Sequence, residues 1–122
     1  MGWHRAEVIA QLVAARGSGQ RVAEIGVLQG ITSAHLLLQP EVVELLAVDP
    51  YWNEEDGSGD DLFAATYSSL LPLSRGRLRF RRAASWNVAD EEADESFDVV
   101  LANYLLSESP HPATASKTQV EN

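Results

Sequence analysis

The sequence predicts an α/β fold built on a parallel sheet. Short apolar runs alternate with segments that have helical periodicity along most of the chain. A mainly apolar run extends from Val22 to Val27 and contains Gly26. A second glycine, Gly30, follows it and leads into a segment that ends at Pro40. Strand, glycine turn and helix in this order are typical of a parallel α/β unit.

Residues 3–16 are predicted to form an amphipathic helix, because Ala6, Ile9 and Val13 recur at helical spacing. Gly17-Ser18-Gly19 then provides a glycine cap and a short loop. The next predicted elements are a strand over 21–27, a helix over 31–39 and a strand over 43–48.

The second half of the chain continues the alternation. A glycine- and acid-rich loop leads into a helix that begins near Asp60 or Asp61 and that Pro72 is expected to close. The alternating residues 78–81 predict a third strand, whose arginines suit the edge of a sheet. The apolar run 97–102 predicts a fourth strand.

The glycine turn holds the candidate functional residues. Gly26 can adopt backbone angles that a side chain forbids, and Gly30 allows another group to approach the main chain closely. The helix that follows presents unpaired N–H groups to a polar or anionic ligand group. Glu24 lies in apolar company, where a carboxylate is costly to bury without a partner. An ordinary strand-to-helix turn with a surface-facing glutamate is the alternative.

The spacing Glu-x-Gly-x-x-x-Gly, formed by Glu24, Gly26 and Gly30, resembles the first motif of the class I S-adenosylmethionine-dependent methyltransferases. Asp49, which ends the second apolar run, strengthens the likeness. The resemblance implies that both glycines line S-adenosylmethionine and that Glu24 helps to hold its methionine end. It further implies that Asp49 bonds the ribose hydroxyls, although Asp49 could also be a turn residue before Pro50.

The same resemblance implies a Rossmann-like, doubly wound parallel sheet with strand order 3-2-1-4, and a methyltransferase that acts on a small-molecule acceptor. Ser85 and Trp86 follow the third strand, where the family contacts the adenine ring. An aromatic face can stack on a purine, but plain packing of Trp86 is an equal alternative.

Other ligand-binding motifs fit the sequence less well. A dinucleotide-binding turn requires a glycine two residues before Gly26, where this chain has Glu24. A phosphate-binding loop requires a lysine directly after its last glycine, and Gly30 is followed by Ile31. The adjacent acids Glu54, Glu55 and Asp56 are expected to be solvated, so no metal site is predicted.

The family pattern breaks after the fourth strand. Asn103 stands where relatives commonly carry an acid, and an amide cannot act as a base at neutral pH, so no catalytic residue is assigned. We expect a cofactor-binding domain over 1–106 and a disordered tail over 107–122. Without further strands, Val99 to Leu101 would lie at an open edge. The chain would then be a shortened enzyme, or a non-catalytic half-domain that pairs with another copy or chain through this edge.

Bulk properties restrict the functional class. With 122 residues the chain forms one domain, and its net charge of −9 argues against nucleic-acid binding. Cysteine is absent, which suits a reducing compartment. No apolar run reaches membrane-spanning length. We therefore expect a cytoplasmic protein that does not enter the membrane.

Overall fold

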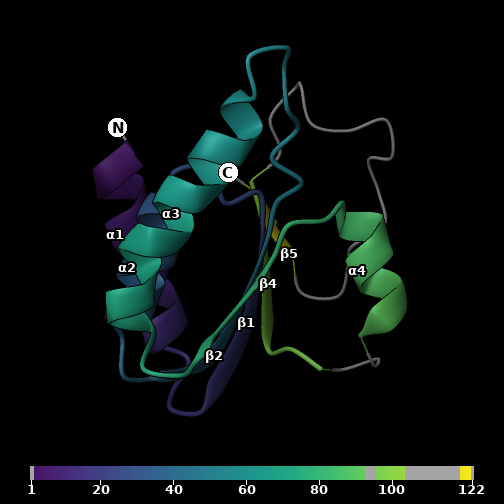
Figure 1. Ribbon diagram of the computed structural model, residues 1–122. Helices are drawn as coiled ribbons and strands as arrows, with labels where there is room; N and C mark the ends of the chain where they lie inside the picture. Colours follow the sequence, from purple (N-terminus) through teal and green to yellow (C-terminus); the bar gives the residue numbers. More distant parts are fainter. Residues whose placement is uncertain (1, 93–95, 104–118, 122) are drawn as a thin grey trace.

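The computed structural model describes residues 2–92, 96–103 and 119–121. These residues form one parallel sheet with helices on both faces (Figure 1). The helices are α1 (Gly2–Ala14), α2 (Ile31–Leu37), α3 (Ser58–Ser74) and α4 (Ser85–Glu91). The strands are β1 (Gln20–Ile25), β2 (Val42–Val48), β3 (Leu78–Arg81), β4 (Val99–Ala102) and β5 (Gln119–Glu121).

The strands lie in the order β3-β2-β1-β4-β5, and every neighbouring pair is parallel. Ile25 at the end of β1 pairs with Val48 on one side and Ala102 on the other. Parallel neighbours need crossover connections, which α2, α3 and α4 supply. The helices α1, α2 and α3 cover one face, and α4 covers the other (Figure 1). The predicted Rossmann-like class and the order 3-2-1-4, with β3 at an edge, are therefore confirmed.

The opposite edge of the sheet differs from the prediction. β5 pairs with β4, with Leu101 opposite Val120 and Ala102 opposite Glu121. The expectation that no strand follows β4 is wrong, because a three-residue strand can add to an edge through its backbone groups alone and needs no apolar period. β4 is therefore not the open edge through which the half-domain hypothesis expects another chain to pair. Residues 107–118 of the predicted tail lie outside the described residues.

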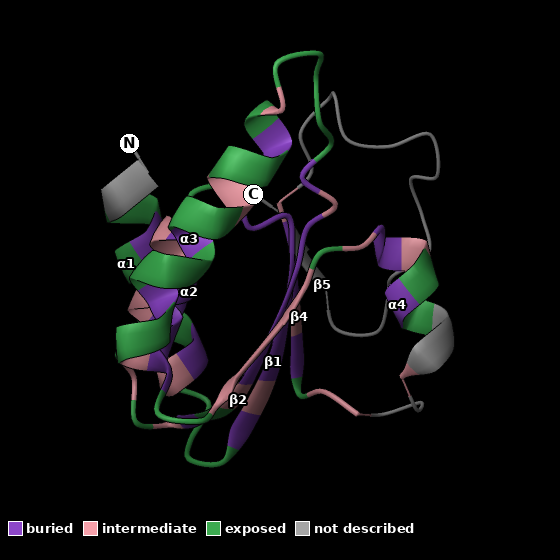
Figure 2. Ribbon diagram, viewed as in Figure 1, coloured by how far each residue is buried: buried purple, intermediate pink, exposed green. Residues whose placement is uncertain are grey.

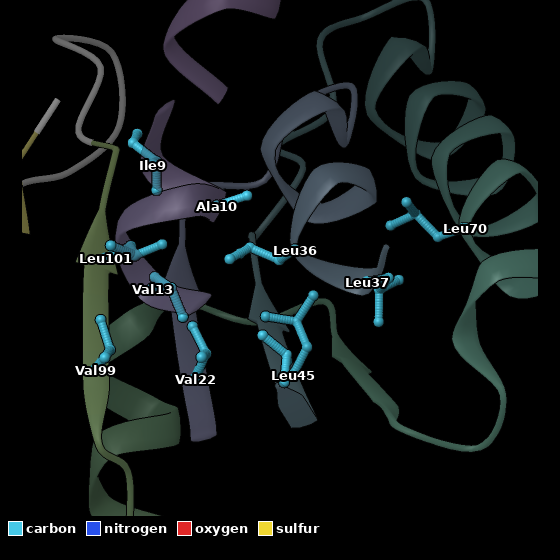
Figure 3. Close-up of a cluster of buried hydrophobic side chains, with 11 residues drawn as sticks. Ile9, Ala10, Val13, Val22, Leu36, Leu37, Leu45, Leu70, Val99 and Leu101 are labelled. Carbon is cyan, nitrogen blue, oxygen red and sulfur yellow. The ribbon is translucent and has the colours of Figure 1, made fainter. Parts of the chain in front are cut away.

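The main core lies between the sheet and the helices α1, α2 and α3. Figure 3 shows its side chains converging from these elements, among them Leu36 of α2, Leu45 of β2 and Leu101 of β4. Each of these three leucines is almost completely buried, which stabilises the fold by about 2 kcal/mol per side chain. Along the strands the residues are mainly buried, whereas the outer faces of the helices are exposed (Figure 2).

Successive residues of β1 face opposite sides of the sheet. Val22 points into the core beneath α1 and α2, while Ala23 and Ile25 pack with Val88 of α4 on the other side. Glu24 shares the face of Val22, so the strand alternation places a carboxyl group under α2.

Helix α1 ends at Ala14 and α2 at Leu37, both two residues before their predicted ends, and larger differences occur in the second half of the chain. Pro72 does not close α3, which continues to Ser74 and ends where Arg75 adopts a left-handed conformation with φ of 49°. Helix α4 was not predicted, since its short polar sequence shows little periodicity. Within the described ranges, no helix has the length and apolar character that crossing a bilayer requires.

Candidate functional site

The glycine turn after β1 is shaped by the chain that follows β4. Gly26 has φ of 92°, and a Cβ atom at this position would overlap the backbone oxygen of Asn103. The N–H of Gly26 donates to the Val48 carbonyl at 2.8 Å, and the N–H of Asn103 donates to the Ile25 carbonyl at 2.7 Å. Both the backbone angle and the close approach therefore require glycine here, as the sequence predicts for this turn.

Gly30 serves helix packing in this structure. It begins α2 with φ of 81°, and a Cβ atom there would lie 3.0 Å from the Thr66 side chain and 3.4 Å from that of Leu70. The close approach that the sequence predicts is therefore made by α3. A cofactor contact at Gly30 stays a prediction.

Glu24 is fully buried and held by two side chains. The Ser33 hydroxyl of α2 donates to Oε1, and the Asn103 side-chain amide donates to Oε2 at 3.2 Å. Burial raises the pKa of Glu24, the Ser33 hydrogen bond opposes the shift, and the nearby Asp49 adds to it, so that the pKa is about 8. The surface-facing alternative is therefore wrong. At neutral pH this carboxyl group is mainly protonated.

Asp49, at the end of β2, holds the glycine turn. Its Oδ2 accepts hydrogen bonds from the N–H groups of Val27 at 2.9 Å and Leu28 at 3.0 Å. Its Oδ1 accepts one from the N–H of Tyr51 at 2.8 Å. The carboxylate is therefore a structural centre that joins the β1 and β2 loops.

The same two loops share a second junction at the Leu28 carbonyl. It accepts hydrogen bonds from the Tyr51 hydroxyl at 2.6 Å and from the Thr66 hydroxyl of α3 at 3.0 Å. Leu28 and Tyr51 have positive φ values of 56° and 46°, which side chains rarely tolerate. Burial, followed by the charge of Asp49, raises the pKa of the Tyr51 phenol, so this hydroxyl remains a donor. Sequence reasoning missed Tyr51 and Thr66, since neither belongs to the glycine motif.

A cavity of about 410 Å³ opens beside these loops, at the carboxyl ends of β1, β2 and β4. It is lined by Gly26, Leu28, Asp49, Pro50, Tyr51, Trp52, Asn53, Glu54, Ser58, Gly59, Leu62 and Asn103. Of the predicted site residues, Gly26 and Asp49 line the cavity directly. Glu24 lies one hydrogen bond away, behind Asn103.

Ser85 and Trp86 stand apart from this lining. Ser85 is buried and begins α4, directly after the loop that leaves β3. Both residues therefore lie beyond the carboxyl end of β3, the end of the sheet that also carries the cavity, without lining it. Their contact with an adenine ring stays a prediction.

Arg82 secures the outer wall of the cavity. Its guanidinium donates to the Tyr51 carbonyl at 2.8 Å and pairs with Asp60 at 2.6 Å. The N–H of Asp60 in turn donates to the side chain of Asn53 at 2.8 Å. The hydrogen bond from Arg82 holds the pKa of the exposed Asp60 below its usual range. Gly59 completes the junction, because a Cβ atom there would overlap the backbone oxygen of Tyr51.

A larger cavity, of about 510 Å³, lies between the ends of α2 and α3. It is lined by Leu37, Leu38, Pro40, Pro72, Leu73, Arg75 and Arg77. Its lining has no acid and no residue from the carboxyl ends of the strands. The smaller cavity is therefore the better candidate site, because ligands of open parallel sheets bind beyond those ends.

No protein-family model and no curated protein matches the chain. Solved structures nevertheless share its fold. A candidate S-adenosyl-L-methionine-dependent methyltransferase from Methanococcus maripaludis superposes with a TM-score of 0.62 at 14% identity, covering 84% of this chain and 44% of that protein. Cofactor-bound Rv0187 from MTB gives a TM-score of 0.61 at 16% identity, covering 82% and 43%.

Coclaurine N-methyltransferase, solved with N-methylheliamine and SAH, gives a TM-score of 0.55 at 16% identity, covering 82% of this chain and 27% of the enzyme. At these identities the likeness shows the fold, which is the Rossmann-like fold of the class I S-adenosylmethionine-dependent methyltransferases. The chain spans less than half the length of each of these three proteins.

Proposed function

We propose that this chain is the cofactor-binding part of an S-adenosylmethionine-dependent methyltransferase that acts on a small molecule. The observation that carries the proposal is the position of the 410 Å³ cavity between Gly26, Asp49 and Asn103. In the order 3-2-1-4, the chain reverses its direction across the sheet between β1 and β4. Open α/β sheets bind ligands at this switch point, and the volume lies in the range of small-molecule sites.

The residues around the cavity fit such a cofactor. Gly26 presents backbone alone to the cavity, and the acids Asp49 and Glu54 in the lining favour a cation. A carboxylate has about four acceptor positions, and Asp49 uses three of them for backbone N–H groups. The position that is left on Oδ1 would accept a ribose hydroxyl. Glu24 would act on the methionine end through Asn103, and Gly30, Ser85 and Trp86 would complete the pocket.

The bound cofactor would supply an electrophilic methyl group, and the chain would supply binding and orientation. No described residue of the cavity is assigned as a general base, since Asn103 has no basic nitrogen at neutral pH. The acceptor would be a small molecule, because the net charge of −9 disfavours a nucleic acid. The absence of cysteine from the sequence supports a cytoplasmic location.

Isothermal titration calorimetry with S-adenosylmethionine and S-adenosylhomocysteine tests the proposal. We expect both to bind the wild type and Asp49→Ala to abolish binding. Thr66→Val is the matched control. It removes one hydrogen bond to the same loop, at the Leu28 carbonyl, and leaves the hydrogen bonds of Asp49 in place. We expect it to weaken binding by only about threefold. Wild-type affinity in Asp49→Ala, or no binding by the wild type, would refute the proposed pocket.

An analogue without ribose hydroxyls separates the two roles of Asp49. If the carboxylate contacts the ribose, the analogue should bind the wild type roughly tenfold more weakly than S-adenosylhomocysteine. In Asp49→Asn the penalty should shrink, because the interaction is already impaired, as in a double-mutant cycle. Equal penalties in both proteins would limit Asp49 to a role in loop structure.

A further inference from the structure

Asn103 links a buried acid to the cavity. Its side-chain nitrogen donates to Glu24 Oε2 at 3.2 Å and to the Gly26 carbonyl at 3.1 Å. A backbone carbonyl can only accept, so the amide nitrogen must face these two oxygens and the amide oxygen must face away from them. Asn103 lines the cavity. Its amide oxygen is therefore the side-chain atom that can meet a donor group of a ligand.

The surroundings of Glu24 contain no cation among the described residues. The charged groups near it are acidic: Asp49 at the end of β2 and, further along the cavity wall, Glu54. Tyr51 adds a buried phenol after β2, and α2 contributes the Ser33 hydroxyl. His35, on the same helix, contacts the Ile31 carbonyl.

The strand partners of Glu24 and the helix face that packs on the neighbouring core are apolar. The strand partners are Ala47 of β2 and Leu101 of β4. The buried face of α1 consists of Ala6, Ile9, Ala10 and Val13. An ionised Glu24 would therefore be a buried charge without a counter-ion, which is strongly unfavourable. A cationic ligand group at Asn103 would supply the missing counter-ion.

We propose that the cavity binds the cationic group of its ligand with release of the Glu24 proton, and that Asn103 is the positioning residue that couples the two events. The inference rests on the proposed function, in which that group is the ammonium of the methionine end of S-adenosylmethionine. The O–H bond of the Glu24 carboxyl breaks, the proton passes to the buffer, and the carboxylate pairs with the ligand cation through Asn103.

The free protein provides the proton for this exchange, since burial raises the pKa of Glu24 to about 8. A bound cation favours the carboxylate and lowers that pKa. Ligand binding should therefore strengthen as the pH rises toward 8, by up to about tenfold per pH unit, and level off above it.

Calorimetry with S-adenosylmethionine at pH 7, in phosphate and in Tris, measures the proton count from the difference in observed enthalpy. We expect the wild type to release roughly 0.5 to 1 proton per ligand bound. Glu24→Gln should release none beyond what the ligand itself releases, because its amide keeps an oxygen for Asn103 and cannot ionise. Binding without proton release, or equal release by Glu24→Gln, overturns this inference and leaves the proposed function intact. Absence of binding removes both.

Asn103→Ala tests the coupling role. We expect its proton count to fall below half of the wild-type value at matched saturation. The control is Trp52→Ala, which alters an exposed residue of the same cavity wall that makes no contact with Glu24. It should weaken binding and keep the wild-type count. A full count in Asn103→Ala would overturn the role of Asn103.

A titration of the ligand-free protein provides a second measurement. The ¹³C carboxyl resonance of Glu24 should titrate with a midpoint near 8. A midpoint near 4.5, the ordinary value for a glutamate, would overturn the proposal even if ligand binding released protons.

Discussion

Asp49 holds the backbone of the two loops that border the cavity. Its carboxylate accepts hydrogen bonds from the N–H groups of Val27, Leu28 and Tyr51. Hydrogen bonds to a charged group contribute about 1.5–3 kcal/mol each when they are protected from water. They hold Leu28 and Tyr51 in left-handed conformations that would otherwise relax. Loss of Asp49 should therefore disturb the shape of the cavity as well as remove the proposed ribose contact.

Glu24 makes stability depend on pH. Its pKa is about 8 in the folded protein and near 4.5 in an unfolded chain, so the folded state binds the additional proton between these values. Stability is then greatest below about pH 4.5 with respect to this group, and decreases by about 1.4 kcal/mol per pH unit up to about pH 8. Glu24→Gln should remove this slope and stabilise the protein by a few kcal/mol at pH 7.5. Urea unfolding at several pH values measures it, and parallel curves for both proteins would contradict the assignment.

Substitutions at Gly26 and Gly19 separate the effect of the close backbone approach at the turn from the effect of a positive φ. Both have positive φ, 92° and 74°, but a Cβ atom at Gly19 meets nothing within 4 Å. Gly19→Ala should therefore cost about 1 kcal/mol, the strain of the left-handed backbone alone. Gly26→Ala should cost about 3 kcal/mol or more, because it also displaces the Asn103 backbone. Urea unfolding of both variants checks this, and equal losses would contradict the role of the close approach.

At the scale of elements, the sequence predicted what local patterns encode. The apolar runs located β1 to β4, and the glycine motif located the turn from β1 to α2. Helix α4 was missed because Val88 is its one buried hydrophobic residue among those described, so it shows almost no apolar period. Topology could have indicated it, since the parallel strands β3 and β4 need a crossover. β5 gave no signal, because its pairing uses backbone groups.

The candidate site was predicted in part for the same reason. Gly26 and Asp49 were found because a motif places both at strand ends. Gly30 matched the motif equally well, but its contact with Thr66 depends on α3, which lies far along the chain. The link from Glu24 to Asn103 spans 79 residues, and no local spacing encodes it.

The loop between β2 and α3 depends on Arg82. Arg82→Gln should release the Tyr51 carbonyl and destabilise the protein by about 1–2 kcal/mol, as expected for hydrogen bonds from a charged donor. Amide hydrogen exchange should accelerate across residues 53–60. Asp60→Asn removes only the partner on the exposed side and should change exchange little, since surface ion pairs contribute little. If the two variants behave alike, Arg82 acts only through the ion pair.

At the scale of the whole molecule, β5 determines which edge the sheet presents. It covers β4, whose residues Val99 and Leu101 are almost fully buried in the described structure. An uncovered strand of this composition would pair with other chains.

Val120→Pro should break the pairing of β5 with β4, because proline cannot donate to the ladder. The variant should self-associate, whereas Ala47→Pro, at a residue of β2 paired with both Glu24 and Phe80, should mainly unfold the sheet from within. Sedimentation velocity and circular dichroism distinguish these results. A Val120→Pro protein with the sedimentation coefficient of the wild type would show that β5 does not protect the edge.

The cavity joins segments that are distant in the sequence: the amide of Asn103 reaches the carbonyl of Gly26 across 77 residues. Contacts of this separation form late in folding, since the long loop must close before they can contribute. A collapsed chain in which only β1 and β2 have paired would lack the cavity wall that Asn103 forms. Ligand affinity should therefore recover during refolding only when β4 has paired with β1, and later than any spectroscopic signal from helix formation.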